Sequence, residues 1–194
     1  MTTPPMTRPS LLVRIRDSGD REAWHQFVEV YAPLVYKFAR RHGLQDADAA
    51  DLTQDVLLAV TGASKRLVYD PQRGTFRGWM YTVARNKLRN FLLARQRRRD
   101  EGDQRLLDEQ PARDEVELWE KEYEQRLFDW AAEQVRGHFQ ESTWRAFWMT
   151  AVEGRGAAEA AAEFRMSVGA VYIAKSRVLA RLREEIQQVT RTEY

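Results

Sequence analysis

Apolar side chains recur every three or four residues through most of the chain, which is the spacing of one face of an α-helix. The clearest run lies between residues 20 and 43, where the apolar positions are Trp24, Phe27, Val28, Tyr31, Leu34, Val35 and Phe38. Pro33 inside this run predicts a bend or break, and Gly43 predicts the end of the helix. No stretch of useful length alternates apolar and polar residues as a half-buried strand does.

The same spacing continues on both sides of one charged segment. It predicts helices over residues 46–64, 75–96, 116–139, 142–154 (capped by Ser142), 157–164 and 167–189. Residues 97–117 are charged, nearly free of aromatic side chains and interrupted by Gly102 and Pro111, which is typical of a linker. We therefore predict an all-α protein of two small helical domains, with an N-terminal extension over 1–20, a first domain over 21–96, a flexible acidic linker over 97–117 and a second domain over 118–190.

Composition narrows the classes of function. The chain has no cysteine and three scattered histidines, which leaves no disulfide framework and disfavours a zinc site. No apolar run approaches the ~20 residues that span a bilayer, and residues 1–10 lack the apolar stretch of a secretory signal. We expect a cytoplasmic protein without a metal, a cofactor or membrane insertion.

The formal net charge of +2 is unevenly distributed along the chain. Residues 1–99 carry 18 Lys or Arg and 9 Asp or Glu, whereas residues 100–194 carry 13 and 20. The acid is concentrated in residues 100–124. An excess of positive charge on one half of a chain suggests a polyanion as the partner of that half.

Residues 75–99 contain eight Lys or Arg and no acidic residue. On a helical wheel Phe76, Met80, Val83, Ala84 and Phe91 form a core stripe; Thr82, Arg85, Asn86 and Arg89 lie opposite, with Trp79 and Asn90 at the border. Arginine and asparagine can contact base edges and phosphates, and an exposed aromatic ring can stack on an unpaired base. The alternative is a core helix with a solvated cationic face.

The last two predicted helices have the arrangement of a helix-turn-helix, whose second helix enters the DNA major groove. A short alanine-rich helix is followed by a three-residue turn and a helix that begins near Ser167. Ser167 and Gly169 would bring backbone N–H groups near a phosphate. Tyr172, Lys175, Ser176, Arg177 and Arg181 supply donors further along. An ordinary helical hairpin with Val178, Leu179 and Leu182 packed inward is the alternative.

Asp48, Asp51 and Asp55 fall on one face of the helix predicted over 46–64. Carboxylates at this spacing could bind a divalent metal or act as general acid and base. However, no histidine partner, glycine-rich phosphate loop or second acidic motif accompanies them. The remaining alternatives are a solvated face and a docking surface for a basic partner.

Four segments occur in a characteristic order: WHQFVEVYAPLVYKFA, DADAADLTQDVLLAV, GTFRGWMYTVARNKLRNFLLARQRR and, after the linker, SVGAVYIAKSRVLARLRE. Together they resemble a bacterial RNA polymerase sigma factor of the extracytoplasmic-function type, over roughly residues 24–185. This resemblance implies a protein that is not an enzyme, that binds core RNA polymerase and promoter DNA, and that in some relatives is held by an anti-sigma factor.

The resemblance also assigns roles to residues. It implies polymerase binding, on the clamp of the β′ subunit, by Asp48, Asp51, Leu52, Gln54 and Asp55. It implies recognition of the minus-ten promoter element, with capture of a flipped base, by the segment YDPQRGTFRGWMYTVARN and by Trp79, Arg85, Asn86, Lys87, Arg89 and Asn90. The helix-turn-helix would read the minus-thirty-five element beside the β flap, and the acidic linker would thread the polymerase channels in place of RNA.

Two departures from the family pattern stand out. Arg165 occupies the turn position that is usually glycine, and because a side chain disfavours positive φ, an altered turn is expected there. Tyr172, Ile173 and Ala174 replace the basic or hydroxyl residues that many relatives carry early in the reading helix, so the promoter sequence cannot be transferred from relatives.

Two rival hypotheses remain at this point. One is a transcriptional regulator that uses only the helix-turn-helix and dimerises through its N-terminal helices. The other is a metal-dependent helical enzyme built on Asp48, Asp51 and Asp55.

Overall fold

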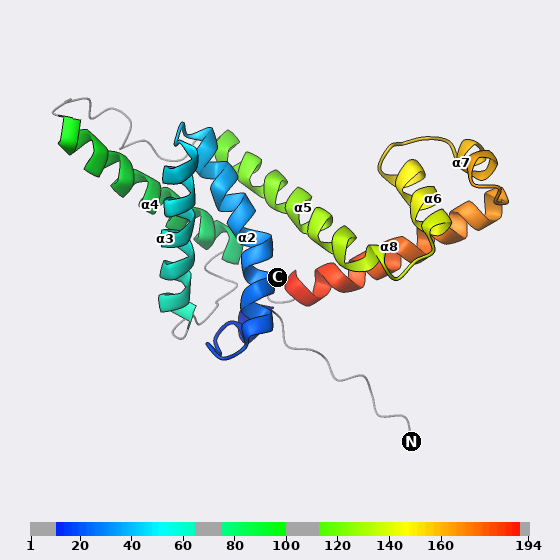
Figure 1. Ribbon diagram of the computed structural model, residues 1–194, viewed down its shortest axis with the longest axis horizontal. Helices are drawn as coiled ribbons and strands as arrows, with labels where there is room; N and C mark the ends of the chain where they lie inside the picture. Colours follow the sequence, from blue (N-terminus) through cyan, green and yellow to red (C-terminus); the bar gives the residue numbers. More distant parts are fainter. Residues whose placement is uncertain (1–10, 65–74, 100–112, 191–194) are drawn as a thin grey trace, which may run out of the picture. The chain divides into compact units, whose positions relative to one another are not determined.

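A computed structural model of the chain describes residues 11–64, 75–99 and 113–190, and these residues form helices and no strand (Figure 1). The helices are α1 (Leu11–Arg14), α2 (Arg21–Arg41), α3 (Asp46–Ser64), α4 (Phe76–Arg99), α5 (Arg113–Arg136), α6 (Glu141–Ala151), α7 (Ala157–Glu163) and α8 (Val168–Thr190). The predicted all-α class is therefore confirmed. None of the helices in these ranges combines the length and the apolarity needed to cross a membrane.

The chain divides into two compact units, one of residues Met1–Arg126 with Val189–Tyr194 and one of residues Leu127–Gln188. The boundary therefore lies inside α5 and not in the predicted linker over 97–117. Helix α4 continues to Arg99 and α5 begins at Arg113, so both ends of that linker are helical. Its central part, like the first ten residues, lies outside the described residues.

In the first unit, α2 packs against α3, α3 against α4 and α1 against α2 (Figure 1). The core is aromatic: the Tyr31 ring lies 5.6 Å from the Phe76 ring, centroid to centroid, and Phe27 and Phe38 are fully buried beside them. Aromatic pairs in such edge-on contacts stabilise a core by ~1 kcal/mol beyond the area they bury.

The first half of α5 completes this core. Trp119 and Tyr123 are fully buried; the Trp119 ring lies 5.6 Å from that of Tyr81, and the Tyr123 ring stacks on Tyr31 at 5.6 Å. The Trp119 Nε1–H also donates to the Arg77 carbonyl oxygen at 3.2 Å. These two residues were predicted to belong to the second domain, and they pack into the first unit instead.

Acidic side chains of α5 hold the same contact through ion pairs. Glu122 lies 3.1 Å from the Lys37 ammonium and also pairs with Arg41 at 2.6 Å. Glu120 pairs with Arg77 at 2.9 Å, and a Glu115 carboxylate oxygen lies 2.9 Å from the His42 Nε2. Part of the acid concentrated in residues 100–124 is therefore matched by basic residues of α2 and α4.

The single core stripe that the helical wheel predicted for α4 is incomplete, because α5 covers a second side of this helix. Phe76, Met80 and Ala84 are buried as predicted, and Val83 and Phe91 are half-buried. Tyr81 and Leu88 are buried as well. Burial, followed by the nearby Glu115 carboxylate, raises the pKa of the Tyr81 hydroxyl to about 12, so this side chain is neutral at physiological pH.

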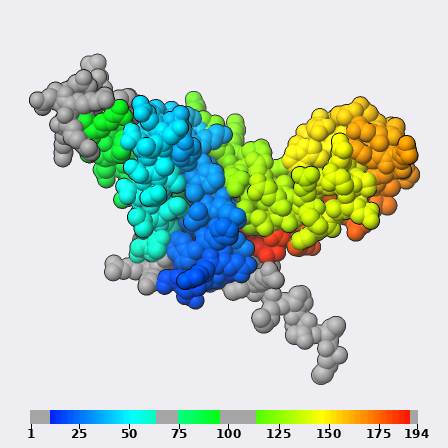
Figure 2. Space-filling model, in the orientation of Figure 1, coloured from blue at the N-terminus to red at the C-terminus, as the bar shows by residue number. Residues whose placement is uncertain are grey.

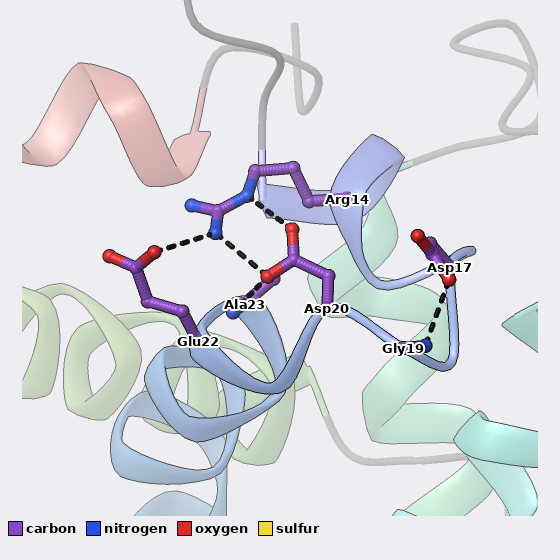
Figure 3. Close-up of polar contacts among 6 residues, drawn as sticks. All are labelled: Arg14, Asp17, Gly19, Asp20, Glu22 and Ala23. Carbon is purple, nitrogen blue, oxygen red and sulfur yellow. Dashed lines mark hydrogen bonds and ion pairs between the residues drawn. The ribbon is translucent and has the colours of Figure 1, made fainter.

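The start of α2 is fixed by a small network of side chains (Figure 3). Asp20 is the N-cap, and its Oδ1 accepts from the Ala23 backbone N–H at 2.9 Å. Arg14 donates to both carboxylate oxygens of Asp20, at 2.8 and 2.9 Å, and to Glu22 at 3.3 Å. The Arg14 bonds, and then the Ala23 N–H, lower the pKa of Asp20.

Helix α2 runs unbroken through Pro33, so the predicted break does not occur. Its buried residues on both sides of Pro33, Tyr31 and Leu34 among them, pack into the core and hold the helix together despite one missing hydrogen bond. The helix ends at Arg41, and the predicted Gly43 forms the turn just after it with a φ of +81°, while the Leu44 N–H donates to the Ala39 carbonyl at 3.2 Å. This is a Schellman turn.

The second unit contains α6, α7 and most of α8, which form one rounded mass in the space-filling view (Figure 2, yellow to orange). Its core joins small and flexible side chains: Ala146, Met149, Ala160, Ala161, Val171 and Ala174. The alanines allow α6, α7 and α8 to approach closely. Helix α6 begins at Glu141 after Gln140, which makes no side-chain cap bond, so the predicted cap Ser142 is wrong.

Candidate nucleic-acid interface

The turn between α7 and α8 keeps the conformation that glycine favours although Arg165 occupies it. Arg165 has a φ of +53°, and the Met166 N–H donates to the Ala161 carbonyl at 2.9 Å, which is again a Schellman turn. The expected alteration of the turn is not observed. A left-handed conformation costs a residue with a side chain on the order of 1 kcal/mol, and the buried contacts of Phe164 and Met166 with the unit 2 core offset it.

Helix α8 begins with a side-chain cap. The Ser167 hydroxyl accepts from the Ala170 N–H at 3.1 Å, so it satisfies one of the amides that lack an intrahelical partner. Ser167 itself is exposed, as is Gly169. Both predicted phosphate contacts therefore lie at the surface of the second unit.

The long sides of α8 differ in character. Val171, Ala174, Val178 and Leu182 are buried, whereas Tyr172, Ser176 and Arg177 are exposed. Two predicted donors make contacts within the unit. The Lys175 ammonium lies 3.5 Å from the Thr150 carbonyl oxygen. Arg181 pairs with Glu184 at 3.1 Å and with Glu185 at 3.3 Å.

Helix α4 presents the second predicted surface. Thr82, Asn86, Arg89 and Asn90 are exposed and Arg85 and Lys87 are half-buried. Trp79 is half-buried, and its ring lies 5.3 Å from Phe76. Two other cations of α4 are paired with acids elsewhere in the first unit: Arg77 with Glu120 at 2.9 Å and Arg95 with Asp48 at 3.7 Å. The residues of YDPQRGT before Thr75 lie outside the described residues.

Helix α3 lies at the surface of the first unit along the face shown in Figure 2 (cyan). Asp51, Gln54 and Asp55 are exposed as predicted. Leu58 follows them at helical spacing and is 68% exposed. Leu58 was not predicted from the sequence as a site residue. The one signal that could have found it is its position on the same helix face as the aspartates. Leu52 is 2% exposed and belongs to the core, so its predicted part in polymerase binding stays a prediction.

Among the described residues, no three His, Cys, Asp or Glu side chains form a group that could hold a metal ion. Asp48, the first of the three predicted carboxylates, is paired with Arg95.

Comparison with known proteins gives a family match where α2, α3 and α4 lie. Residues 27–98 match the family described as Sigma-70 region 2. The ECF RNA polymerase sigma factor RpoE of Cereibacter sphaeroides is 32% identical over 78 residues, which are 40% of this chain and 42% of that protein. The ECF RNA polymerase sigma factor SigE of Mycolicibacterium smegmatis is 34% identical over 100 residues, which are 50% of this chain and 37% of that protein.

A solved structure of CnrH in complex with the cytosolic domain of CnrY covers 90% of this chain and 93% of its own, at 24% identity and a TM-score of 0.36. The region 2 match over residues 27–98 covers α3 and most of α2 and α4. With the curated relatives, this match supports the resemblance to sigma factors of the extracytoplasmic-function type that the sequence motifs indicate. The chain spans about two fifths of the length of the curated relatives it matches.

Proposed function

We propose that this protein binds core RNA polymerase and directs it to promoters, without catalysing a reaction of its own. The observation that carries the proposal is the region 2 match over residues 27–98. This segment holds two different surfaces on two helices: an acidic one on α3 and an acid-free cationic one on α4. A protein that joins a basic polymerase surface to DNA needs both.

The α3 surface, defined as Asp51, Gln54, Asp55 and Leu58, is the proposed polymerase contact, on the clamp of β′. Exposed carboxylates steer the approach of a basic partner, and the exposed Leu58 supplies an apolar anchor at the C-terminal end of this surface.

The α4 surface, defined as Thr82, Arg85, Asn86, Arg89 and Asn90 with Trp79 at its edge, is the proposed minus-ten contact. Cations and amides would hold the backbone and base edges of the melted strand. Trp79 would stack on an unpaired base, and Lys87 would add positive charge. DNA opening would then be driven by binding energy, so no nucleotide hydrolysis is required.

The helix-turn-helix of the second unit is the proposed reader of the minus-thirty-five element, beside the β flap. The second candidate function rests on the same observation: an intact helix-turn-helix could serve a regulator that binds duplex DNA without joining the polymerase. Such a regulator would bind promoter DNA but would not recruit core RNA polymerase.

Reconstitution separates the two candidates. The full chain is mixed with core RNA polymerase and fragmented DNA of its host, and the transcripts are sequenced from their 5′ ends. A sigma factor co-elutes with core enzyme and yields starts that share two upstream elements. Tight specific binding to duplex DNA by the chain alone, with no transcripts when core is added, would favour the regulator.

A further inference from the structure

The first two turns of α8 expose an apolar patch, which we call the apolar reading face: Val168, Gly169, Tyr172 and Ile173. Tyr172 is 62% exposed, Ile173 61% and Val168 43%. Three large apolar side chains are thus exposed within six residues of one helix, and exposed apolar surface of this kind can mark an interaction site.

The second unit does not need this face for its own core. Val171 and Ala174, on the other side of α8, are buried in a cluster with residues of α6 and α7, and Val178 on the same side is also buried. Only one side of α8 therefore packs within the second unit. The apolar reading face is exposed to solvent, and an exposed apolar surface lowers solubility unless a partner covers it.

The surrounding charge identifies the kind of partner. Residues 164–183 contain five Lys or Arg and no acidic residue. Ser176 and Arg177 continue the exposed face by one turn. An apolar patch within a cationic surround fits a polyanion that also carries apolar groups, and the DNA major groove is one: each thymine places its C5-methyl there.

Gly169 supports close approach by such a partner. A Cβ atom added at this position would meet only the Ser167 Oγ, at 3.9 Å. Nothing within the unit therefore requires a glycine here, although alanine is the better helix former. Without a side chain at this position, the groove floor can come nearer to Val168 and Ile173.

We propose that Ile173, next to the exposed Tyr172 at the start of α8, selects thymine in the upstream promoter element by contact with the thymine C5-methyl group, while Arg177 holds the neighbouring DNA. This inference rests on the proposed function of the helix-turn-helix. The protein would then recognise the centre of this element through an apolar contact. Arginine or asparagine at such positions would instead recognise guanine or adenine through paired hydrogen bonds.

Deoxyuridine tests the contact directly, because it pairs as thymine does and lacks only the methyl group. Holoenzyme made from core polymerase and the full chain is first used to map its promoters. Each thymine of the upstream element is then replaced singly by deoxyuridine, and holoenzyme affinity is measured by competition. We expect one or two positions where affinity falls about fourfold, the factor that corresponds to one buried methyl group.

Variants assign the effect to the side chain. Ile173→Ala should bind thymine and deoxyuridine equally at the sensitive position, and because the residue is exposed its thermal unfolding should match wild type. Arg177→Ala should weaken binding to both bases and keep their ratio. Val152→Ala, which shortens an exposed apolar residue outside α8, is the matched control and should keep the fourfold ratio.

Specific outcomes overturn the inference. If promoters are transcribed and no thymine position changes by more than twofold, or if Ile173→Ala keeps the ratio, the methyl contact is wrong while the proposed function stands. If the chain neither binds core enzyme nor supports transcription, the proposed function fails and this inference fails with it. Binding of the apolar reading face to anionic vesicles, lost in Ile173→Ala, together with insensitivity to deoxyuridine, would assign the face to membranes instead.

Discussion

Two Schellman turns of this protein place different residues at the same backbone position. Gly43 ends α2 with a φ of +81°, and Arg165 ends α7 with a φ of +53°. Glycine adopts this conformation freely, whereas arginine must overcome a clash between its Cβ and the backbone. The α7 turn therefore stores strain that the α2 turn does not.

Replacing Arg165 by glycine relieves that strain. We expect Arg165→Gly to raise the free energy of unfolding by ~0.5–1 kcal/mol, less the entropy that glycine adds to the unfolded chain. Urea denaturation followed by circular dichroism measures this.

Arg165 would also affect DNA binding if its side chain contacts a phosphate. In that case the slope of log DNA affinity against log salt concentration should fall by ~1 in magnitude in Arg165→Gly. Arg165→Ala, which keeps the strained turn but removes the guanidinium, provides the comparison.

Asp20 combines two roles that substitution can separate. It caps α2 through the Ala23 N–H and pairs with Arg14 (Figure 3). Because its pKa is lowered in the folded protein, the stability that its charge contributes is present above the ordinary value of ~3.9 and is lost as the pH falls through the folded-state value.

Asp20→Asn keeps a capping side chain and removes the charge, whereas Asp20→Ala removes both. We expect the asparagine variant to lower the melting temperature at pH 7 less than the alanine variant does. Its difference from wild type should shrink below pH 4. A difference that stays constant from pH 7 to pH 3 would contradict the role of the Arg14 pair.

At the scale of elements, α3 and α4 separate two proposed tasks within one unit. Asp51→Ala with Asp55→Ala should weaken binding of core polymerase, measured by pull-down, about tenfold or more. Arg85→Ala with Asn86→Ala should spare polymerase binding and impair promoter opening, measured by permanganate reactivity of the melted bases. Glu124→Ala with Glu133→Ala removes two exposed acids of α5 and serves as the charge-matched control. Equal loss of polymerase binding in the α3 and α4 variants would contradict the division.

Periodicity predicted the helices well because each has an apolar face that must be buried. It did not predict what covers that face. Tyr81 was left out of the core because the wheel of α4 allowed one buried side, while α5 supplies a second through Trp119. Leu58 was not selected as a site residue, because a leucine that lies among aspartates on a helix face has no periodic signal of its own.

At the scale of the molecule, the position of the boundary inside α5 makes a prediction about fragments. A fragment of residues 11–126 should unfold cooperatively and at a higher temperature than a fragment of residues 11–99, because only the longer one contains Trp119 and Tyr123. Circular dichroism on heating compares them. Equal melting temperatures would show that the first half of α5 adds nothing to the first unit.

Trp119→Ala in the longer fragment tests the same contact at one residue. Loss of a fully buried tryptophan should lower the free energy of unfolding by about 3–5 kcal/mol. Trp119→Phe keeps an aromatic ring and loses the donor to the Arg77 carbonyl, so its loss should be smaller. Urea titration of both variants measures the difference.

The shared helix α5 also sets an order of events during synthesis. Residues 11–99 leave the ribosome with the aromatic side of α2 and α4 still uncovered, and Trp119 and Tyr123 follow only after more than a dozen further residues. At ~5–20 residues per second, this interval lasts on the order of a second or more. For that time Tyr31 and Tyr81 lack the cover that Tyr123 and Trp119 give them, so the first unit completes its core only when the first half of α5 has been made.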